Sequence, residues 1–316
     1  MAQIYKPGDV YFCTFPKFVQ RPNTNDYNID SLKENASPRP VAILHEIDSN
    51  RAIAAPISSD GSQNHLVYDT FVPIKAANYP SFLKKDSFIK TNQIQVIDTK
   101  WLYPSTSPRL VGSLNTVDLD RTRYFSLYAT QTEKAYTKWI SEIVSKNVKS
   151  IDHGTLEAAL KMELPLHSRP ERRHPLDFNR MEVYKCHFQP AIHNPSPERI
   201  SGTHAGILLT DGKYGHIPPG QTIAVPLVIN VEANKGIFSS LDVGISINGQ
   251  VMRACVSQIQ PMNRDWIEGQ ALGKVDKLQM LDLDRSVINV LGLRDQVIEK
   301  SRSLIKDMGK NRSKAR

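Results

Sequence analysis

The sequence predicts a mainly β protein of the α+β class, made of two tandem copies of one small domain. Each copy is expected to be a curved, mostly antiparallel barrel with a C-terminal helix. The string QIQVIDTKW, which begins at Gln93, is answered by QIQPMNRDW, which begins at Gln258, an offset of 258 − 93 = 165 residues. Each half also contains short runs rich in β-branched and aromatic residues and bounded by Pro, Gly, Asn or Ser, which is typical of strands.

Two further blocks repeat in the same order. VYFCTF, from Val10, matches VYKCHF, from Val183, and the tetrapeptide DLDR occurs at Asp118 and again at Asp282. Their offsets, 183 − 10 = 173 and 282 − 118 = 164, are close to that of the first block. Three blocks in one order at nearly one spacing indicate a tandem duplication.

The first copy, residues 1–149, is expected to contain four strands and a helix. The strand-like runs are GDVYFCTF, PVAILHEI, RAIAAPIS and SFIKTNQIQVI. A polar stretch between the first two, Pro16 to Pro38, is long enough for a functional loop. Asp118 is expected to cap a helix whose apolar residues, from Phe125 to Ile143, fall near helical spacing and face the core.

The second copy repeats this layout after a linker. Residues 150–178 form a basic, proline-containing linker in which a short helix, Thr155 to Leu164, runs into LPLHSRPERRHPLD. Residues 179–316 repeat strand-like runs near MEVYKCHF, AGILLT, TIAVPLVI and VMRACVSQI. They are expected to end in a helix from Asp282 to about Lys306, followed by a basic tail.

Composition limits the function classes. With 316 residues, of which 40% are apolar, the chain can fill two cores. No apolar run reaches the roughly 18 residues of a membrane span and no signal-peptide core is present, so a soluble cytoplasmic protein is expected. The three cysteines, Cys13, Cys186 and Cys255, indicate neither a disulfide framework nor a metal site. The net charge of +8 weakly favours a polyanionic partner.

The strings GDVYF, RPVAIL, AIAAPISS and DSFIKTNQIQVIDTKWL, in this order, resemble the PemK/MazF family of toxin endoribonucleases, from Pro7 to about Leu127. The resemblance implies a barrel fold and cleavage of single-stranded RNA at a short sequence without metal or other cofactor. It also implies a homodimer that binds RNA along the groove between its subunits, and a separate antitoxin that silences it.

The first copy carries the residues that such cleavage needs. RNA supplies its own nucleophile, the 2′-OH, so a metal-free ribonuclease must position the phosphodiester and stabilise charge on its oxygens. Arg39 presents forked, permanently charged donors that match a phosphate, and Ser58 would add a hydroxyl donor. The family's catalytic Arg and its Thr or Ser match these two positions. A surface ion pair for Arg39 and a turn-capping hydroxyl for Ser58 are the alternative interpretations.

Four residues of the following segment are expected to contact RNA: Lys85, Lys90, Asn92 and Gln93. Relatives often have an acidic residue where this chain has Asn92, so a carboxylate that would assist proton transfer is absent. His45 is the nearest spare base in sequence, although a lone histidine at a strand end is more often structural. The first copy therefore uses an unusual base, cleaves slowly, or does not cleave.

The second copy departs further. Matching Ala205 to Val41 sets Thr203 opposite Arg39 and His204 opposite Pro40, and matching the next strand sets Val228 opposite Ser58. The second copy is therefore expected to keep the fold and to lose the reaction.

Fusion of two copies raises their effective concentration to about the millimolar range, so an intramolecular pseudo-dimer, monomeric in solution, is expected to replace the homodimer. Two other classes stay open. One is a non-catalytic protein that binds nucleic acid, and the other is an interaction protein that occupies an antitoxin.

Overall fold

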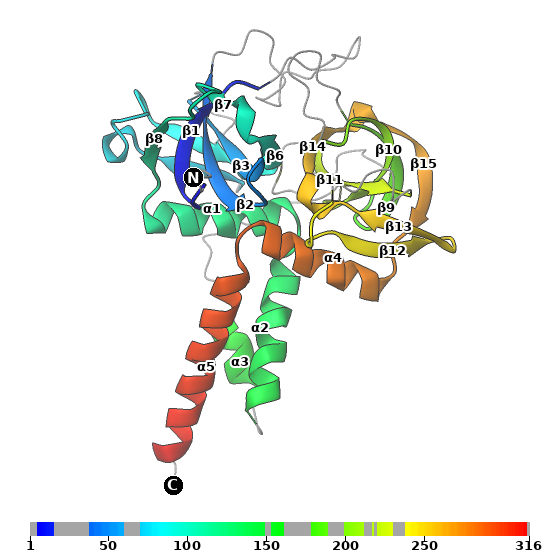
Figure 1. Ribbon diagram of the computed structural model, residues 1–316. Helices are drawn as coiled ribbons and strands as arrows, with labels where there is room; N and C mark the ends of the chain where they lie inside the picture. Colours follow the sequence, from blue (N-terminus) through cyan, green and yellow to red (C-terminus); the bar gives the residue numbers. More distant parts are fainter. Residues whose placement is uncertain are drawn as a thin grey trace.

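The structure is a computed structural model that describes residues 5–15, 38–59, 70–148, 153–160, 178–188, 199–211, 217, 220–229 and 238–314. Residues 16–37 of the expected loop, and most of the expected linker, lie outside the described residues. Figure 1 shows two curled sheets side by side, with a group of helices beside and below them. This arrangement confirms the predicted α+β fold of two antiparallel barrel-like halves.

The first sheet has eight strands in the order β4-β5-β3-β2-β1-β7, with β6 paired to β3 and β8 paired to β1. All of its described pairings are antiparallel. The strands are β1 (Asp9–Cys13), β2 (Arg39–Glu46), β3 (Arg51–Ser58), β4 (Phe71–Ile74), β5 (Ser87–Lys90), β6 (Gln95–Asp98), β7 (Leu102–Tyr103) and β8 (Leu110–Ser113).

The second sheet has seven strands in the order β12-β13-β11-β10-β9-β15, with β14 paired to β11. This order is the same as that of the first sheet when the strands of each half are matched in sequence order. The one difference is that the single strand β15 takes the place of β7 and β8. The strands are β9 (Glu182–Phe188), β10 (Gly202–Leu208), β11 (Gln221–Val228), β12 (Val243–Ile247), β13 (Gln250–Ala254), β14 (Gln260–Asn263) and β15 (Ile267–Lys274).

Individual contacts repeat as well as strands. Leu114 N donates to Gly8 O at 2.8 Å, and Val275 N donates to Met181 O at 2.9 Å. Gly8 and Met181 share a positive φ, 93° and 72°. One small core cluster contains Tyr5, Tyr11, Cys13, Phe15, Ile43, Ala54, Ile97, Trp101 and Leu102, and its counterpart contains Phe178, Tyr184, Cys186, Phe188, Leu208, Ala224, Met262, Trp266 and Ile267. The two halves therefore repeat one set of contacts, which fits a duplicated fold.

Helices follow each sheet in matching pairs. The first pair is α1 (Thr116–Ala129) and α2 (Glu133–Asn147), and the second is α4 (Lys277–Val290) and α5 (Arg294–Lys314). The helix expected at Thr155 is α3 (His153–Leu160), and residues 161–164 of that expectation lie outside the described part. Among the described helices, none is long and apolar enough to cross a membrane.

Two of the expected helices are each divided into two in the structure. The apolar stripe ending at Ile143 belongs to two helices, because the chain turns at Gln131 with φ 51°. The helix expected from Asp282 is likewise divided between α4 and α5 at Gly292, where φ is 71°. Each break spans only three residues, 130–132 and 291–293, so the helical spacing of apolar residues continues nearly unchanged across it and the periodicity did not reveal it.

The predicted N-cap is also wrong. Asn115 caps α1, since its side chain accepts from Asp118 N at 2.8 Å. Asp118 lies in the first turn and instead accepts a hydrogen bond from the Tyr79 hydroxyl at 2.5 Å. An acidic residue in the first turn resembles a cap in sequence because both favour the positive end of the helix dipole.

The DLDR repeat is not a structural equivalence. The N-caps Asn115 and Asp276 are 276 − 115 = 161 residues apart, as are Gln131 and Gly292 (292 − 131 = 161). The DLDR offset of 164 is three residues larger, which is nearly one helical turn. An amphipathic helix repeats its pattern at this spacing, so the two tetrapeptides match in letters but not in position.

The two halves share one continuous core. Apolar residues of both sheets and of the helices form a single buried cluster. Helices α2 and α5 run side by side away from the sheets (Figure 1). Arg285 of α4 forms an ion pair with Glu142 of α2, and Gln296 Nε2 donates to Asp120 Oδ1 at 2.6 Å. The halves are therefore packed as one body within the chain.

Candidate functional site

Arg39 and Ser58 lie at the ends of two neighbouring strands of the first barrel. Arg39 is the first residue of β2, and Ser58 is the last residue of β3. The pairing of these strands runs through Ala42 with Ala55 and ends at Val41 with Pro56, two residues short of Arg39 on one strand and of Ser58 on the other. Because side chains alternate along a strand, Arg39 shares a face with Val41 and Ser58 shares a face with Pro56. The two residues predicted to be catalytic therefore lie on one face, at the end of the sheet where this pairing stops.

The strands separate at this end of the barrel. Beyond Pro56, β3 leaves β2 and pairs with β5, where Ser58 lies opposite Phe88. Arg39 is half-buried, while Ser58 is buried. A guanidinium and a hydroxyl at a point where two strands part can donate hydrogen bonds to one bound anion.

Cys13 lies opposite Arg39 on β1 but does not neutralise it. The thiol is fully buried, and this burial raises its pKa above the usual range. A neutral thiol is neither a nucleophile nor a counter-ion. The Arg39 charge at this end of the barrel is thus not compensated by Cys13.

Three of the four residues expected to contact RNA are buried. Lys90, Asn92 and Gln93 are 3%, 2% and 1% exposed, while Lys85 is exposed on the turn before β5. The Lys90 ammonium lies 5.7 Å from the centre of the Phe71 ring. The structure therefore leaves Lys85 alone among the four at the surface.

Asn92 has a partner in the other copy. Its Nδ2 donates to Gln221 Oε1 at 2.6 Å, and the neighbouring Val96 N donates to Ile259 O at 3.2 Å. A carboxylate at position 92 could not donate to the Gln221 oxygen. The asparagine that stands in place of an acidic residue thus joins the two copies.

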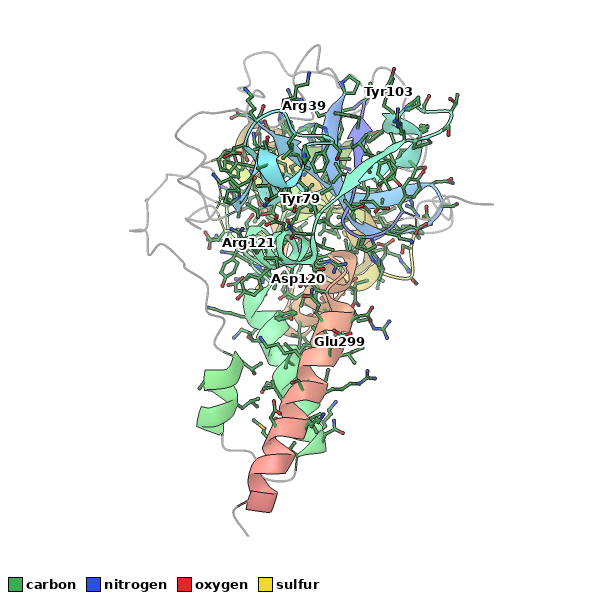
Figure 2. The ribbon with its side chains drawn as sticks, turned by 90° about the vertical axis from the view of Figure 1, so that its left-hand side faces the viewer. Arg39, Tyr79, Tyr103, Asp120, Arg121 and Glu299 are labelled. Carbon is green, nitrogen blue, oxygen red and sulfur yellow. The ribbon has the colours of Figure 1, made fainter. Side chains whose placement is uncertain are left out.

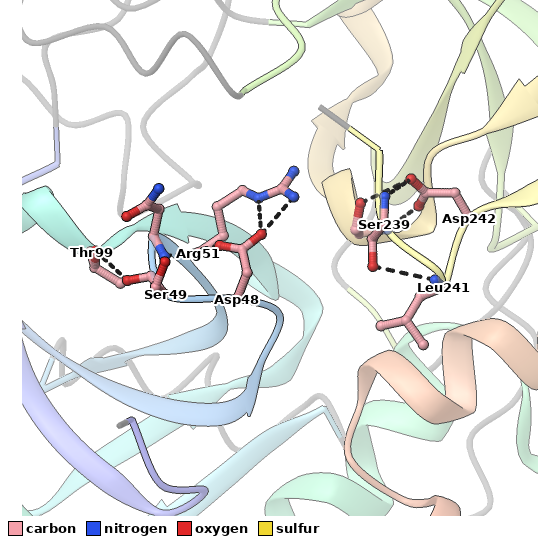
Figure 3. Close-up of polar contacts among 9 residues, drawn as sticks. Asp48, Ser49, Arg51, Thr99, Ser239, Leu241 and Asp242 are labelled. Atoms are coloured by element: carbon pink, nitrogen blue, oxygen red, sulfur yellow. Dashed lines mark hydrogen bonds and ion pairs between the residues drawn. The ribbon is translucent and has the colours of Figure 1, made fainter. Parts of the chain in front are cut away.

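The same boundary holds a second set of polar contacts. Arg51 of the first copy bonds Asp48 Oδ2 at 2.6 Å, and Asp242 of the second accepts from Ser239 N at 2.8 Å and Ser257 N at 2.9 Å. Figure 3 shows these two groups on the facing sides of the boundary. Burial raises the Asp242 pKa, and its N–H donors oppose that rise. Arg51 and Asp242 are thus each bonded within their own copy, whereas Asn92 is bonded across the boundary.

His45 lies at the wrong end of β2 to act on this site. It is opposite Ile53, beyond a bulge in the β2–β3 pairing. Six residues of extended strand separate it from Arg39, which corresponds to about 20 Å. The expectation that His45 is the general base is not supported by this position.

The position of His45 predicts a pH effect on stability. Burial and the nearby Arg123 lower its pKa, while Asp295 raises it. Its folded pKa therefore lies below the unfolded value of about 6.5, so the unfolded chain binds more protons as pH falls. The stability associated with neutral His45 is present above about pH 6.5 and is lost as pH falls through the folded pKa.

We expect the urea midpoint of the parent, minus that of His45→Gln, to be larger at about pH 7.5 than at about pH 5.5, because only the parent loses stability when His45 is protonated. The same difference at both pH values would contradict a lowered His45 pKa in the folded protein.

The second copy has a different pair at the equivalent positions. Cys13 lies opposite Arg39, and its counterpart Cys186 lies opposite His204. His204, and not Thr203, is therefore the counterpart of Arg39, which corrects the sequence alignment by one residue. The pairing of β11 agrees, because Pro226 lies opposite Gly206 as Pro56 lies opposite Val41.

Val228 is confirmed as the counterpart of Ser58. Val228 lies opposite Arg253 at the end of β11, as Ser58 lies opposite Phe88 at the end of β3. The arginine and the hydroxyl are both missing from the second copy.

Sequence reasoning missed a contact between the copies at Arg199. Its guanidinium lies 5.4 Å from the centre of the Trp101 ring of the first copy, and its Nη2 donates to Gln260 Oε1 at 2.8 Å. Burial lowers the Arg199 pKa to about 9. No repeat or motif includes Arg199, so only the packing of the two copies could identify it.

No protein-family model and no curated protein sequence matches the chain. Among solved structures, the Mycobacterium tuberculosis toxin MazF-mt6 is similar at 16% identity and a TM-score of 0.26, over 39% of this chain and 96% of that one. An endoribonuclease from Mycobacterial species is similar at 15% identity and a TM-score of 0.27, over 36% and 91% of the two chains. An endoribonuclease in complex with its cognate antitoxin, also from Mycobacterial species, gives 16% identity, 37% and 96% coverage, and a TM-score of 0.27.

In the described ranges, no group of three or more His, Cys, Asp or Glu residues is placed to hold a metal ion.

Proposed function

We propose that the chain is an endoribonuclease toxin, in which the first copy (within residues 1–149) cleaves single-stranded RNA at a short sequence without a metal. The second copy (within residues 179–316) is its inactive partner in an intramolecular pseudo-dimer in the cytoplasm. The proposal is supported by the position of Arg39 at the start of β2 and of Ser58 at the end of the adjacent β3 in the first copy, where the second has His204 and Val228. The motifs shared with the PemK/MazF family support the same reaction.

In this reaction the RNA 2′-oxygen attacks the adjacent phosphorus, a bond from phosphorus to the 2′-oxygen forms, and the bond to the 5′-oxygen breaks. The 2′ proton passes to water, and the departing 5′-oxygen takes a proton from water. Arg39 is positioned to hold two phosphate oxygens as negative charge develops, and Ser58 to donate a hydrogen bond to the same group. The products are a 2′,3′-cyclic phosphate and a 5′-hydroxyl.

Incubation of a mixed single-stranded RNA with the purified chain in excess chelator, followed by mapping of the new ends, tests this function. Cleavage at one short sequence with 5′-hydroxyl ends is the expected result. Absence of cleavage, or cleavage that the chelator abolishes, would count against it.

Replacing Ser58 with Ala should slow this cleavage by about 10- to 100-fold, because one charge-assisted hydrogen bond to the phosphate is lost. Single-turnover rates on one RNA report the loss directly. Val228→Ala, at the matching position of the second copy, is the control and should leave the rate unchanged. Equal rates for the parent and Ser58→Ala would remove Ser58 from the site.

A non-catalytic role is the second candidate. The structure does not bring His45 to Arg39, and position 92 has an amide in place of a carboxylate. A protein of this kind would bind single-stranded RNA, or a separate antitoxin, without cleaving it. RNA that is retained intact by the protein, or co-purification of an antitoxin with no cleavage, would favour this candidate.

A further inference from the structure

The buried amide of Gln95 makes no hydrogen bond with the described residues. Gln95 is the first residue of β6 and is 1% exposed, and neither its Nε2 nor its Oε1 has a hydrogen-bond partner in the part of the chain that the structure describes. A buried amide of this kind destabilises the fold, because both atoms have lost their hydrogen bonds to water. Native proteins keep few such groups, and a ligand site is one reason for keeping one.

The equivalent amide of the second copy is bonded at both atoms. Gln95 and Gln260 occupy the same place in the repeated QIQ block, and each begins its strand, β6 or β14. Gln260 Oε1 accepts from Arg199 Nη2 at 2.8 Å, and Gln260 Nε2 donates to Ile200 O at 2.9 Å. In the second copy the amide thus binds one donor and one acceptor that lie side by side, whereas in the first copy both atoms are open.

Gln95 lies on the face of the first sheet that carries Arg39 and Ser58. It is opposite Ala54 of β3, and side chains alternate along a strand, so Gln95, Ala54 and Ser58 share one face. Ala54 and Ser58 are four residues apart, which is about 13 Å along an extended strand. Ser58 is buried as well, so RNA must open this face to reach either residue.

Arginines of both copies add positive charge to this face. Arg199 of the second copy lies over the ring of Trp101, which belongs to the same small cluster as Cys13. Burial raises the pKa of the Cys13 thiol, and the nearby Arg199 charge opposes that rise. Arg39 lies opposite Cys13, at the end of the barrel away from Asp120 of α1 (Figure 2). Two guanidiniums beside one neutral thiol favour a negatively charged ligand.

We propose that Gln95 reads one base of the single-stranded RNA, with its amide oxygen and nitrogen bonded to the edge of that base. The inference rests on the proposed function, because Gln95 shares the face of the residues that hold the scissile phosphate. Each base carries an N–H donor beside an acceptor on its Watson–Crick edge, the same pair that Arg199 and Ile200 present to Gln260. A peptide group offers these two atoms too, but the guanidiniums on this face favour a polyanion. In a duplex these edges are already paired, so only a single strand fits.

End mapping of cleavage in a pool of random-sequence single-stranded RNA, by the parent and by Gln95→Met, tests base reading. The parent should cleave within one short sequence. Gln95→Met should lose the preference for one base of that sequence by about 5- to 150-fold, the range for one base edge bonded at two atoms, and should keep the preferences at the other positions. Gln260→Met is the matched control and should keep every preference, because groups of the chain already bind its amide.

Thermal unfolding of the same variants gives a second readout. Gln95→Met removes an amide that has no partner among the described residues, so its midpoint should rise by a few degrees, whereas Gln260→Met removes two hydrogen bonds and should have a lower midpoint. A lower midpoint for Gln95→Met would show that the chain itself binds the amide, and would overturn the inference. Unchanged base preferences in Gln95→Met would also overturn it and would leave the proposed function standing. A parent that cleaves no RNA of the pool would overturn both.

Discussion

Replacing Arg39 with Ala should lower the rate of RNA cleavage on the order of 1,000-fold or more, because the charge that stabilises the phosphate in the transition state is lost. The thermal midpoint should change little, since Arg39 is half-buried at the very start of β2. Arg39→Lys should recover only part of the rate, because an ammonium cannot hold two oxygens in one plane. Single-turnover rates of cleavage on one RNA, and the thermal unfolding midpoints, should be measured for the parent, Arg39→Ala and Arg39→Lys.

His204→Ala is the matched control for Arg39→Ala, because His204 occupies the same register position in the second copy. Its cleavage rate should equal that of the parent. A folded Arg39→Ala variant that cleaves at the parent rate would show that Arg39 is not catalytic. Loss of cleavage in His204→Ala would show that the second copy is not inactive.

A truncated chain that lacks residues 179–316 should not be a soluble monomer. The apolar cluster that runs through both copies would be cut, and α2 would lose α5 as its partner. Asn92 would lose its hydrogen bond to Gln221, and Val96 its bond to Ile259. Exposure of a large apolar face leads to aggregation or self-association, so the truncated chain should precipitate or form a dimer through the same surface.

Solubility, sedimentation and cleavage assays of the truncated chain, beside the full chain, check this result. A truncated chain that is a soluble monomer with full cleavage activity would mean that the second copy is not needed.

The strands could be predicted from the sequence because their signals are local. The QIQ block and the VYFCTF block identify equivalent elements, since Cys13 and Cys186 occupy matching places in the two small cores. The DLDR block failed because a helix repeats its pattern every three or four residues. His204 was misplaced by one residue because AGIL and VAIL are similar in letters at a slip of one, and only the pairing with β9 and β11 resolves the register.

The candidate site was predictable only in part. Arg39 and Ser58 lie at the ends of consecutive strands, which sequence motifs can indicate. The burial of Asn92 and Gln93 follows from the packing of one copy against the other, because their segment contacts β11 and β14, and no local pattern encodes this packing. The contact of Arg199 with Trp101 also arises from this packing.

In the proposed function, one chain contains a complete pseudo-dimer with a single active copy. Sedimentation velocity of the purified chain, with RNA cleavage assayed in each resolved species, separates this arrangement from a dimer of chains. We expect cleavage to accompany the monomer of 35.6 kDa and to be absent from the Arg39→Ala monomer. Cleavage confined to a dimer of full chains, with an inactive monomer, would contradict it.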